Sequence, residues 1–320
     1  MYYTQENSIK RSDKLFSRNI STHESSLIKT ELDLTYDISV SQSKTYLYCI
    51  IESKNESEIY ALDKNIPDAQ FQLLIERKEG IYNSIKEFEG SIYALTNDDA
   101  LNNRVMIYEN KAWKEIIPHS KNRLINDFIF TENYVVLNTF ENAFSEIVYK
   151  AKNDKKWTAL KLPSKIHAAS ISNMKNNSIQ VTYSSPKKPF TVYQFDLAQD
   201  KLTETKTSKI NRQFERETKY IRSEQIWAKS ADGVKVPITI SKSVNPKRKH
   251  KGLILKVYGA YGSFPGGSDF SAQDMILMKD GFSIAYAHVR GGSIMGNQWH
   301  EDGKLLNKEN SFNDYIACAE

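Results

Sequence analysis

Residues 36–75, YDISVSQSKTYLYCIIESKNESEIYALDKNIPDAQFQLLI, contain the pattern that decides the fold of the first two hundred residues. Four short runs rich in β-branched and aromatic residues lie at 36–40, 46–51, 57–62 and 71–75, separated by polar turns. Runs of this length and composition predict β-strands, and their close spacing predicts antiparallel hairpins. The stretch therefore predicts one four-stranded sheet.

Similar units follow along the chain. Comparable openings begin at Tyr36, Tyr82, Ile125 and His167, so successive units are 46, 43 and 42 residues long. Four strands in a unit of about 40 to 50 residues are typical of a β-propeller blade, whose sheet is covered by neighbouring blades. A β-sandwich with coincidental spacing is the alternative. Because residues 1–35 resemble the end of an earlier blade, we predict a partial propeller of about four blades over residues 1–202.

The pattern changes after residue 202. A polar stretch predicts a linker at 203–219, and two strands flanking Ala231-Asp232-Gly233 predict a hairpin. Two buried-strand patterns, 252–258 and 282–289, enclose a short helix at 275–279 that Ser271 and Asp274 open as a capping box. Strand, helix and strand at this spacing predict a βαβ unit in a parallel sheet. A second helix is expected to start at Ser311, with an apolar face formed by Phe312, Tyr315, Ile316 and Ala319.

Composition excludes several classes of protein. Hydrophobic residues make up 40% of the chain and charged residues 26%, which is incompatible with wholesale disorder. The only two cysteines, Cys49 and Cys318, favour a reducing compartment over a disulfide framework. The net charge of +5 is dispersed, and the longest apolar run, 46–51, is too short to span a membrane. We expect a soluble, cytoplasmic protein with no cofactor, metal, nucleic-acid partner or membrane contact.

Seven motifs in the last third carry a resemblance to a known family. They are YIRSEQIW at 220–227, DGVKVP at 232–237, YGAYG at 258–262, HVRGG at 288–292, GNQWH at 296–300, GK at 303–304 and KENSFND at 308–314. In this order the chain resembles the prolyl oligopeptidase family of serine peptidases, most closely its oligopeptidase B branch. The repeat region is similar to the family's propeller more loosely, around 27–40 and 58–63.

The resemblance implies a peptidase in which a propeller gates access to an α/β-hydrolase domain, here beginning at residue 220. Its substrates would be short peptides cleaved after Arg or Lys. Such enzymes need Ser, acid and His in that order, with the serine in a G-x-S-x-G turn. The nearest matches, GGSDF at 266–270 and GGSIM at 291–295, lack the final glycine, so Ser268 and Ser293 are interpreted as loop serines. His288 and His300 are expected to be structural.

The triad is therefore expected beyond Glu320. On this interpretation the chain is an internal fragment that is inactive alone, and its partners are short peptides and the remainder of the same enzyme. The alternative is a β-propeller binding protein without catalytic activity. Four unclosed blades and a half-built parallel sheet would leave strand edges and an apolar face uncovered, which favours the fragment.

Two functional positions follow from the resemblance. Tyr258 matches the tyrosine whose hydroxyl donates to the oxyanion; Tyr261 is the competing assignment, and a packed core tyrosine is the structural alternative. Asp269 matches an acidic position that binds basic substrate side chains, and the alternative is a carboxylate favoured by a helix N-terminus. One departure is Ile294, where an acidic residue commonly stands in the family.

Overall fold

The computed structural model describes residues 1–263 and 266–320, and the side chain of residue 213 lies outside the description. The chain divides into two compact units, 1–118 and 119–320, and each is described by itself. The division falls between two sheets of the repeat region, so the expected domain boundaries at 202 and 220 stay a prediction. None of the helices in the described part combines the length and hydrophobicity needed to cross a lipid bilayer.

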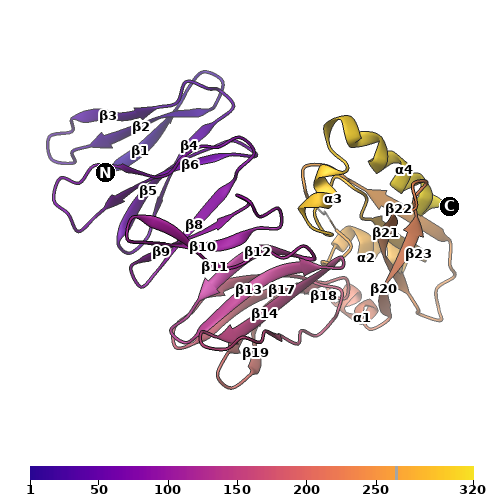
Figure 1. The fold of residues 1–320 in the computed structure, drawn as a ribbon. Coiled ribbons are helices and arrows are strands. Elements are labelled where there is room, and N and C mark those ends of the chain that lie inside the picture. Colours follow the sequence, from indigo (N-terminus) through magenta and orange to yellow (C-terminus); the bar gives the residue numbers. More distant parts are fainter. Residues whose placement is uncertain (264–265) are drawn as a thin grey trace. The chain divides into compact units, whose positions relative to one another are not determined.

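The first unit contains three antiparallel sheets (Figure 1). The first has three strands, and the second and third have four each, paired in chain order. The strands are β1 (Tyr2–Glu6), β2 (Ser12–Arg18) and β3 (Ser25–Thr30); β4 (Asp37–Gln42), β5 (Tyr46–Glu52), β6 (Ser57–Asp63) and β7 (Gln72–Ile75); and β8 (Asn83–Phe88), β9 (Ser91–Thr96), β10 (Arg104–Glu109) and β11 (Ala112–Ile117). The four strands predicted within residues 36–75 are confirmed.

Each sheet buries a face against its neighbour. Leu15 from β2 packs with Ile38 and Ile51 of the next sheet. Ile59 from β6 packs with Ile92 of β9 in the same way. Strand alternation places these residues on one face, and burying each removes apolar surface worth about 1.5–3 kcal/mol. This mutual covering of successive sheets is what the repeat predicts for propeller blades.

The second unit begins with two more four-stranded antiparallel sheets. Their strands are β12 (Arg123–Phe130), β13 (Tyr134–Glu141), β14 (Phe144–Ala151) and β15 (Thr158–Ala159), then β16 (Ala168–Asn173), β17 (Ser178–Ser185), β18 (Lys188–Asp196) and β19 (Lys201–Thr207). The core between the two sheets is apolar and aromatic, with Val136, Ile147, Ile179, Val181 and Phe195 almost fully buried.

Part of the expected linker is a strand. Residues 203–207 belong to β19, which pairs with β18 from Asp196 to Thr191, and α1 (Arg212–Thr218) follows. The strand is polar because it forms the edge of its sheet and most of its side chains face solvent. Threonine, which occurs three times in it, favours extended backbone. The prediction of a linker at these five residues was therefore wrong.

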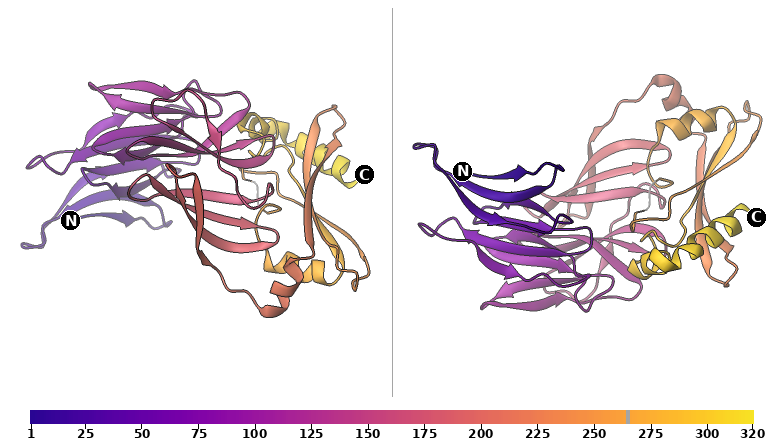
Figure 2. Two further views of the ribbon diagram at one scale, coloured as in Figure 1. Left: turned by 90° about the horizontal axis from the view of Figure 1, so that it is seen from below. Right: turned by 90° about the horizontal axis from the view of Figure 1, so that it is seen from above.

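The last sheet has the order β20-β21-β23-β22. Strands β20 (Ile221–Lys229) and β21 (Lys235–Ser243) form the predicted hairpin; β22 (Gly252–Val257), α2 (Ala272–Lys279) and β23 (Phe282–Ala287) form the predicted βαβ unit, with β22 parallel to β23. Helix α2 and helix α4 (Lys308–Ala319) lie on opposite faces of this sheet (Figure 2). Each helix covers its own apolar cluster, so both faces of the sheet are covered in part, whereas Leu253 and Val257 of β22 stay about half exposed.

Helix α4 departs from the sequence prediction in its start and its buried face. It begins at Lys308, after α3 (Asn297–Glu301) and a 3₁₀ turn (Leu305–Asn307), rather than at Ser311. Phe312 and Ile316, which the periodicity placed in the core, are 62% and 55% exposed. The buried residues are instead Ser311 and Asp314. A polar face is buried here because it meets a buried arginine, described below.

Candidate functional site

The carboxyl ends of β22 and β23 meet at one edge of the last sheet. Ligands bind at this edge in open α/β sheets. A small pocket lies here, lined by Tyr258, by Tyr286 and His288 from β23 and its continuation, and by neighbouring backbone. Tyr258 follows β22 directly, and Asp269 lies in the loop that leads from β22 to α2. The two residues that the resemblance singled out therefore come from one loop at this edge.

Tyr258 is an exposed tyrosine held by a tight turn. Its side chain is about half exposed, so the alternative of a packed core tyrosine is wrong. The next residue, Gly259, has φ 62°, and an added Cβ would lie 2.4 Å from Cγ2 of Val289. Only glycine allows this approach, and it lets the chain turn immediately after Tyr258. Among the residues that the structure describes, the Tyr258 hydroxyl has no hydrogen-bond partner.

Tyr261, the competing assignment, lies in the same turn but in a different setting. It has φ 59° and is 66% exposed. It is not among the residues that line the pocket, whereas Tyr258 is. The pocket therefore distinguishes the two tyrosines by position.

Asp269 lies two residues before Ser271, the N-cap of α2. Desolvation raises the pKa of its carboxyl, as does the nearby charge of Asp274, whereas a hydrogen bond from its own backbone N–H lowers it. Within the described ranges, no residue forms an ion pair with this carboxylate, and the residue is exposed. The carboxylate in the first helical turn belongs to Asp274 rather than to Asp269.

Asp274 is buried and fully engaged. Its backbone N–H donates to Ser271 Oγ at 3.2 Å, which confirms the predicted cap. Its carboxylate accepts from Lys256 Nζ and, at 2.7 Å, from the Tyr286 hydroxyl. Desolvation raises the pKa of Tyr286 most, and the hydrogen bond to the Asp274 carboxylate raises it further. Sequence reasoning missed this cluster, although Lys256 stands out as a charge inside the apolar run 252–258.

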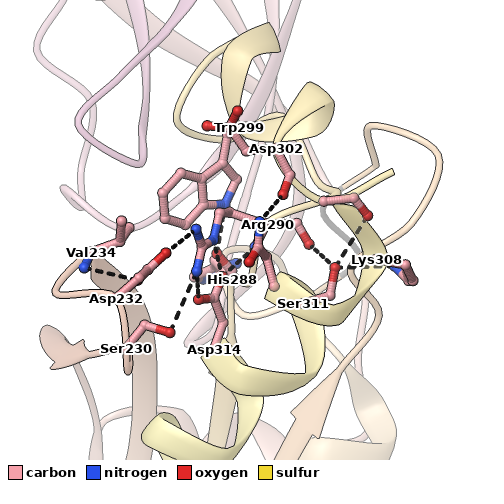
Figure 3. A network of polar contacts seen from close by, with 12 residues as sticks. Ser230, Asp232, Val234, His288, Arg290, Trp299, Asp302, Lys308, Ser311 and Asp314 are labelled. Atoms are coloured by element: carbon pink, nitrogen blue, oxygen red, sulfur yellow. Dashed lines mark hydrogen bonds and ion pairs between the residues drawn. The ribbon is translucent and has the colours of Figure 1, made fainter. Parts of the chain in front are cut away.

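Behind the pocket, a buried arginine joins three elements (Figure 3). Arg290 donates through Nε and Nη2 to the two oxygens of Asp314 in α4, at 3.0 and 2.6 Å, and its backbone N–H donates to Asp314 as well. Its Nη1 donates at 2.6 Å to Asp232 in the β20–β21 turn. The Asp314 carboxylate, fully buried, raises the pKa of Arg290, and Arg290 lowers the pKa of Asp232. Three of the seven motifs thus meet in one ion network.

Glycines bring the backbone of these motifs into contact. An added Cβ on Gly291 would lie 2.1 Å from the carbonyl oxygen of Gly259, and one on Gly303 would lie 2.2 Å from the carbonyl carbon of Arg290. Ser311 Oγ donates to Arg290 O at 2.6 Å, and Lys308 Nζ donates to Gly259 O. These contacts hold the turn after Tyr258 against the start of α4.

The histidines and serines of the motifs have structural partners. His288 is buried with its Nε2 at 2.8 Å from Thr239 Oγ1, and burial lowers its pKa to about 4. His300 Nδ1 donates to Gly291 O at 2.8 Å, and Ser293 Oγ donates to Gly262 O. Across the described residues, no serine is hydrogen-bonded to a histidine that also contacts a carboxylate. An activated nucleophile of the serine-peptidase type is therefore not found in this part of the chain.

Ile294 packs into an apolar cluster where the resemblance places an acid. It is 3% exposed and contacts Leu124, Phe140 and Ala143 from β12, β13 and the turn that follows. A carboxylate at this position would be desolvated among apolar side chains. The isoleucine that replaces the family's acidic residue therefore fits the apolar surroundings of this position.

Comparisons with known proteins agree with the fold and the motifs. The sequence model of the prolyl oligopeptidase N-terminal β-propeller domain matches residues 1–208, and that of the prolyl oligopeptidase family matches residues 268–320. The chain belongs to the prolyl oligopeptidase family of serine peptidases. Its fold is a partial β-propeller followed by the first part of the peptidase domain.

The matches to relatives in this family cover nearly the whole of this chain but less than half of each relative. Protease 2 of Moraxella lacunata is 28% identical, and the match covers 100% of this chain and 47% of that protein. A prolyl endopeptidase-like protein of Rattus norvegicus is 29% identical, and the match covers 90% of this chain and 40% of that protein. The chain spans about half the length of the curated relatives it matches.

Solved structures show the same fold at lower identity. Oligopeptidase B from Leishmania major superimposes with a TM-score of 0.86 at 20% identity, covering 99% of this chain and 47% of that one. Oligopeptidase B from Trypanosoma brucei, in a closed form with covalently bound antipain, superimposes with a TM-score of 0.87 at 24% sequence identity. The match covers 99% of this chain and 48% of that one.

Proposed function

We propose that this chain supplies the propeller and the first part of the catalytic domain of a serine peptidase that hydrolyses short peptides after Arg or Lys. The observation that carries the proposal is that, among the described residues, neither the Tyr258 hydroxyl nor the Asp269 carboxylate has a hydrogen-bond or ion-pair partner in another residue, and that both belong to the segment between β22 and α2. One group can donate to a developing oxyanion, and the other can bind a cationic side chain.

The nucleophile, general base and orienting acid come from the part of the enzyme that lies outside this chain. Support comes from the described residues, which hold no serine–histidine–carboxylate constellation, and from relatives about twice as long. In the proposed reaction the serine attacks the scissile carbonyl and the histidine accepts the serine proton. The phenol of Tyr258 then donates a hydrogen bond to the carbonyl oxygen as it becomes an oxyanion. The propeller limits access of larger substrates to this site.

A binding measurement tests the substrate side of the proposal. Nα-acetylarginine amide should bind the chain, and Asp269→Asn should remove that binding while Asp280→Asn, an exposed acid beyond the end of α2, leaves it unchanged. Equal binding by both variants would contradict the role of Asp269. The chain alone should not hydrolyse arginine-containing chromogenic peptides. Hydrolysis that a serine-directed inhibitor abolishes would contradict the proposal that the nucleophile lies outside this chain.

The role of Tyr258 is tested in an active enzyme. We expect the chain fused to the C-terminal half of Protease 2 to hydrolyse such peptides, and Tyr258→Phe to lower kcat about 10²- to 10³-fold with little change in KM, because the hydroxyl acts only in the transition state. Tyr261→Phe is the matched control, since it removes the hydroxyl of the other tyrosine in the same turn. A larger loss for Tyr261→Phe would reverse the assignment.

A further inference from the structure

Lys256 is a charged residue on the inner face of the last sheet. It lies opposite Tyr286 in the parallel pair β22–β23, on the face that α2 covers. Its Nζ forms an ion pair with Asp274 and lies 3.4 Å from the Tyr286 hydroxyl. Its neighbours on that face, including Ile254, Ile284 and Met275, are apolar. A charged group here is therefore an exception within an otherwise hydrophobic layer.

Stability alone does not explain this ion pair. Taking two charges out of water opposes their attraction, and apolar residues of similar volume are often as stable or more so. Asp274 is only 7% exposed, whereas the Lys256 side chain keeps a quarter of its surface exposed. The more exposed partner of this ion pair is thus the lysine, and its ammonium occupies the Oδ1 atom of the buried carboxylate.

The cluster is in contact with the loop that carries Asp269. An added Cβ on Gly266 would lie 2.3 Å from Cε1 of Tyr286, and one on Gly267 would lie 3.1 Å from Tyr286 Cβ. The two glycines therefore rest directly on the tyrosine ring. Asp274 is also close enough to Asp269 for its charge to act on that carboxyl. Two carboxylates, five residues apart in the chain, therefore flank the N-cap of α2, and one is exposed whereas the other is paired with Lys256.

We propose that Lys256 is a specificity-determining residue that occupies Asp274, so that the site recognises one cationic side chain, through Asp269, rather than two. The inference rests on the proposed function, because it concerns the same site. Asp269 is the carboxylate open to a guanidinium or ammonium group. Asp274 becomes available only when Lys256 is removed.

Two ligands separate one-charge from two-charge recognition. Nα-acetylarginine amide carries one guanidinium, and Nα-acetyl-arginyl-arginine amide carries two. Isothermal titration calorimetry on the full chain should give affinities for the two ligands within about twofold of each other, since only one carboxylate is free. Lys256→Ala vacates the ammonium position and exposes Asp274, so it should favour the doubly charged ligand by about tenfold or more.

Matched variants make each outcome decisive. Lys256→Ala/Asp274→Asn leaves the same space without the second charge, and the preference should vanish; Lys256→Arg keeps the cation and should behave like the parent chain. An unchanged ratio in Lys256→Ala, with a melting temperature showing that it is folded, would overturn the inference. If Lys256→Ala does not fold, the test uses the parent chain, Lys256→Ala/Asp274→Asn and Asp274→Asn. A tenfold preference of any of these three for the doubly charged ligand would also overturn the inference. A failure of the proposed function looks different, because then Asp269→Asn changes neither affinity.

Discussion

The layer between the sheets β12–β15 and β16–β19 and the region around Arg290 are both buried, but different chemistry holds them together. The first is filled by apolar and aromatic side chains such as Val136, Ile179 and Phe195. The second is built from an arginine with two carboxylates and from glycines whose backbones touch. Many residues can satisfy the first arrangement, whereas very few can satisfy the second. The sequence of a blade is thus constrained by pattern, and that of the Arg290 region by individual residues.

The fold superimposes with a TM-score of 0.86 at only 20% identity. Blades retain their shape when one apolar residue replaces another of similar volume. The recognisable motifs, in contrast, cluster where a guanidinium must find its carboxylates and where a Cβ has no room.

Arg290→Met provides the strongest test of this comparison. It leaves Asp314 fully buried without its cation, so we expect a loss of about 3–5 kcal/mol of unfolding free energy. Hydrogen exchange at α4 and β23 should report the loss locally. Arg123→Met is the control, since Arg123 pairs with Glu141 at the blade surface and should matter by about 1 kcal/mol or less. Equal effects of the two substitutions would break the comparison.

Gly291→Ala tests the backbone contacts. We expect a loss of about 3 kcal/mol in chemical denaturation, because φ is 98° and the new methyl group would overlap the carbonyl oxygen of Gly259. Gly90→Ala, in the β8–β9 turn, has φ 81° but nothing within 4 Å of the added Cβ. It should lose only about 1 kcal/mol from backbone strain. A similar loss at both positions would mean that conformation, not close approach, governs Gly291.

His288 gives the Arg290 region a pH dependence of stability. Burial lowers its pKa to about 4 in the folded chain, below the value of about 6.5 expected when unfolded. As the pH falls from about 6.5 to 4 the unfolded chain binds a proton first, so stability is full above this window and declines within it. The decline is at most about 3 kcal/mol. Urea unfolding as a function of pH should show it, and His288→Gln should flatten the curve relative to the parent chain.

Ile179→Val is expected to have the smallest effect. Ile179 is fully buried between the two blades of the second unit, and the substitution removes one methylene from an apolar layer that can partly relax. We expect a loss of about 1 kcal/mol, measured by the shift of the denaturation midpoint. A loss as large as that of Arg290→Met would show that the blade core is as exacting as the ion network.

The elements whose apolar residues recur at a regular spacing could be predicted from the sequence. The four strands of residues 36–75, the hairpin around Ala231-Asp232-Gly233 and the βαβ unit are all in place because local alternation and turn residues determine them. Strand β19 was not accessible, since its Thr, Lys and Glu side chains are those of a linker as well as of an edge strand. Pairing with β18 decides between the two, and pairing is not a local property.

The partnerships at the candidate site were also hidden. The motifs containing Arg290, Asp232 and Asp314 were visible in the sequence, but not that one guanidinium joins them over separations of 58 and 24 residues. For the same reason α4 was given an apolar buried face, when Asp314 had to point inward. Lys256 and Asp274 likewise become partners only once α2 lies across the sheet. Tyr258 and Asp269 were placed by resemblance, and their roles stay predictions.

The reach of Arg290 also bears on the order in which a growing polypeptide can fold. Each blade needs only itself and an adjacent blade, so blades can form one after another as they leave the ribosome. The guanidinium, in contrast, cannot leave water favourably until Asp314 has emerged, 24 residues after Arg290. The sheet β20–β23 is thus expected to consolidate only after Asp314 has been synthesised.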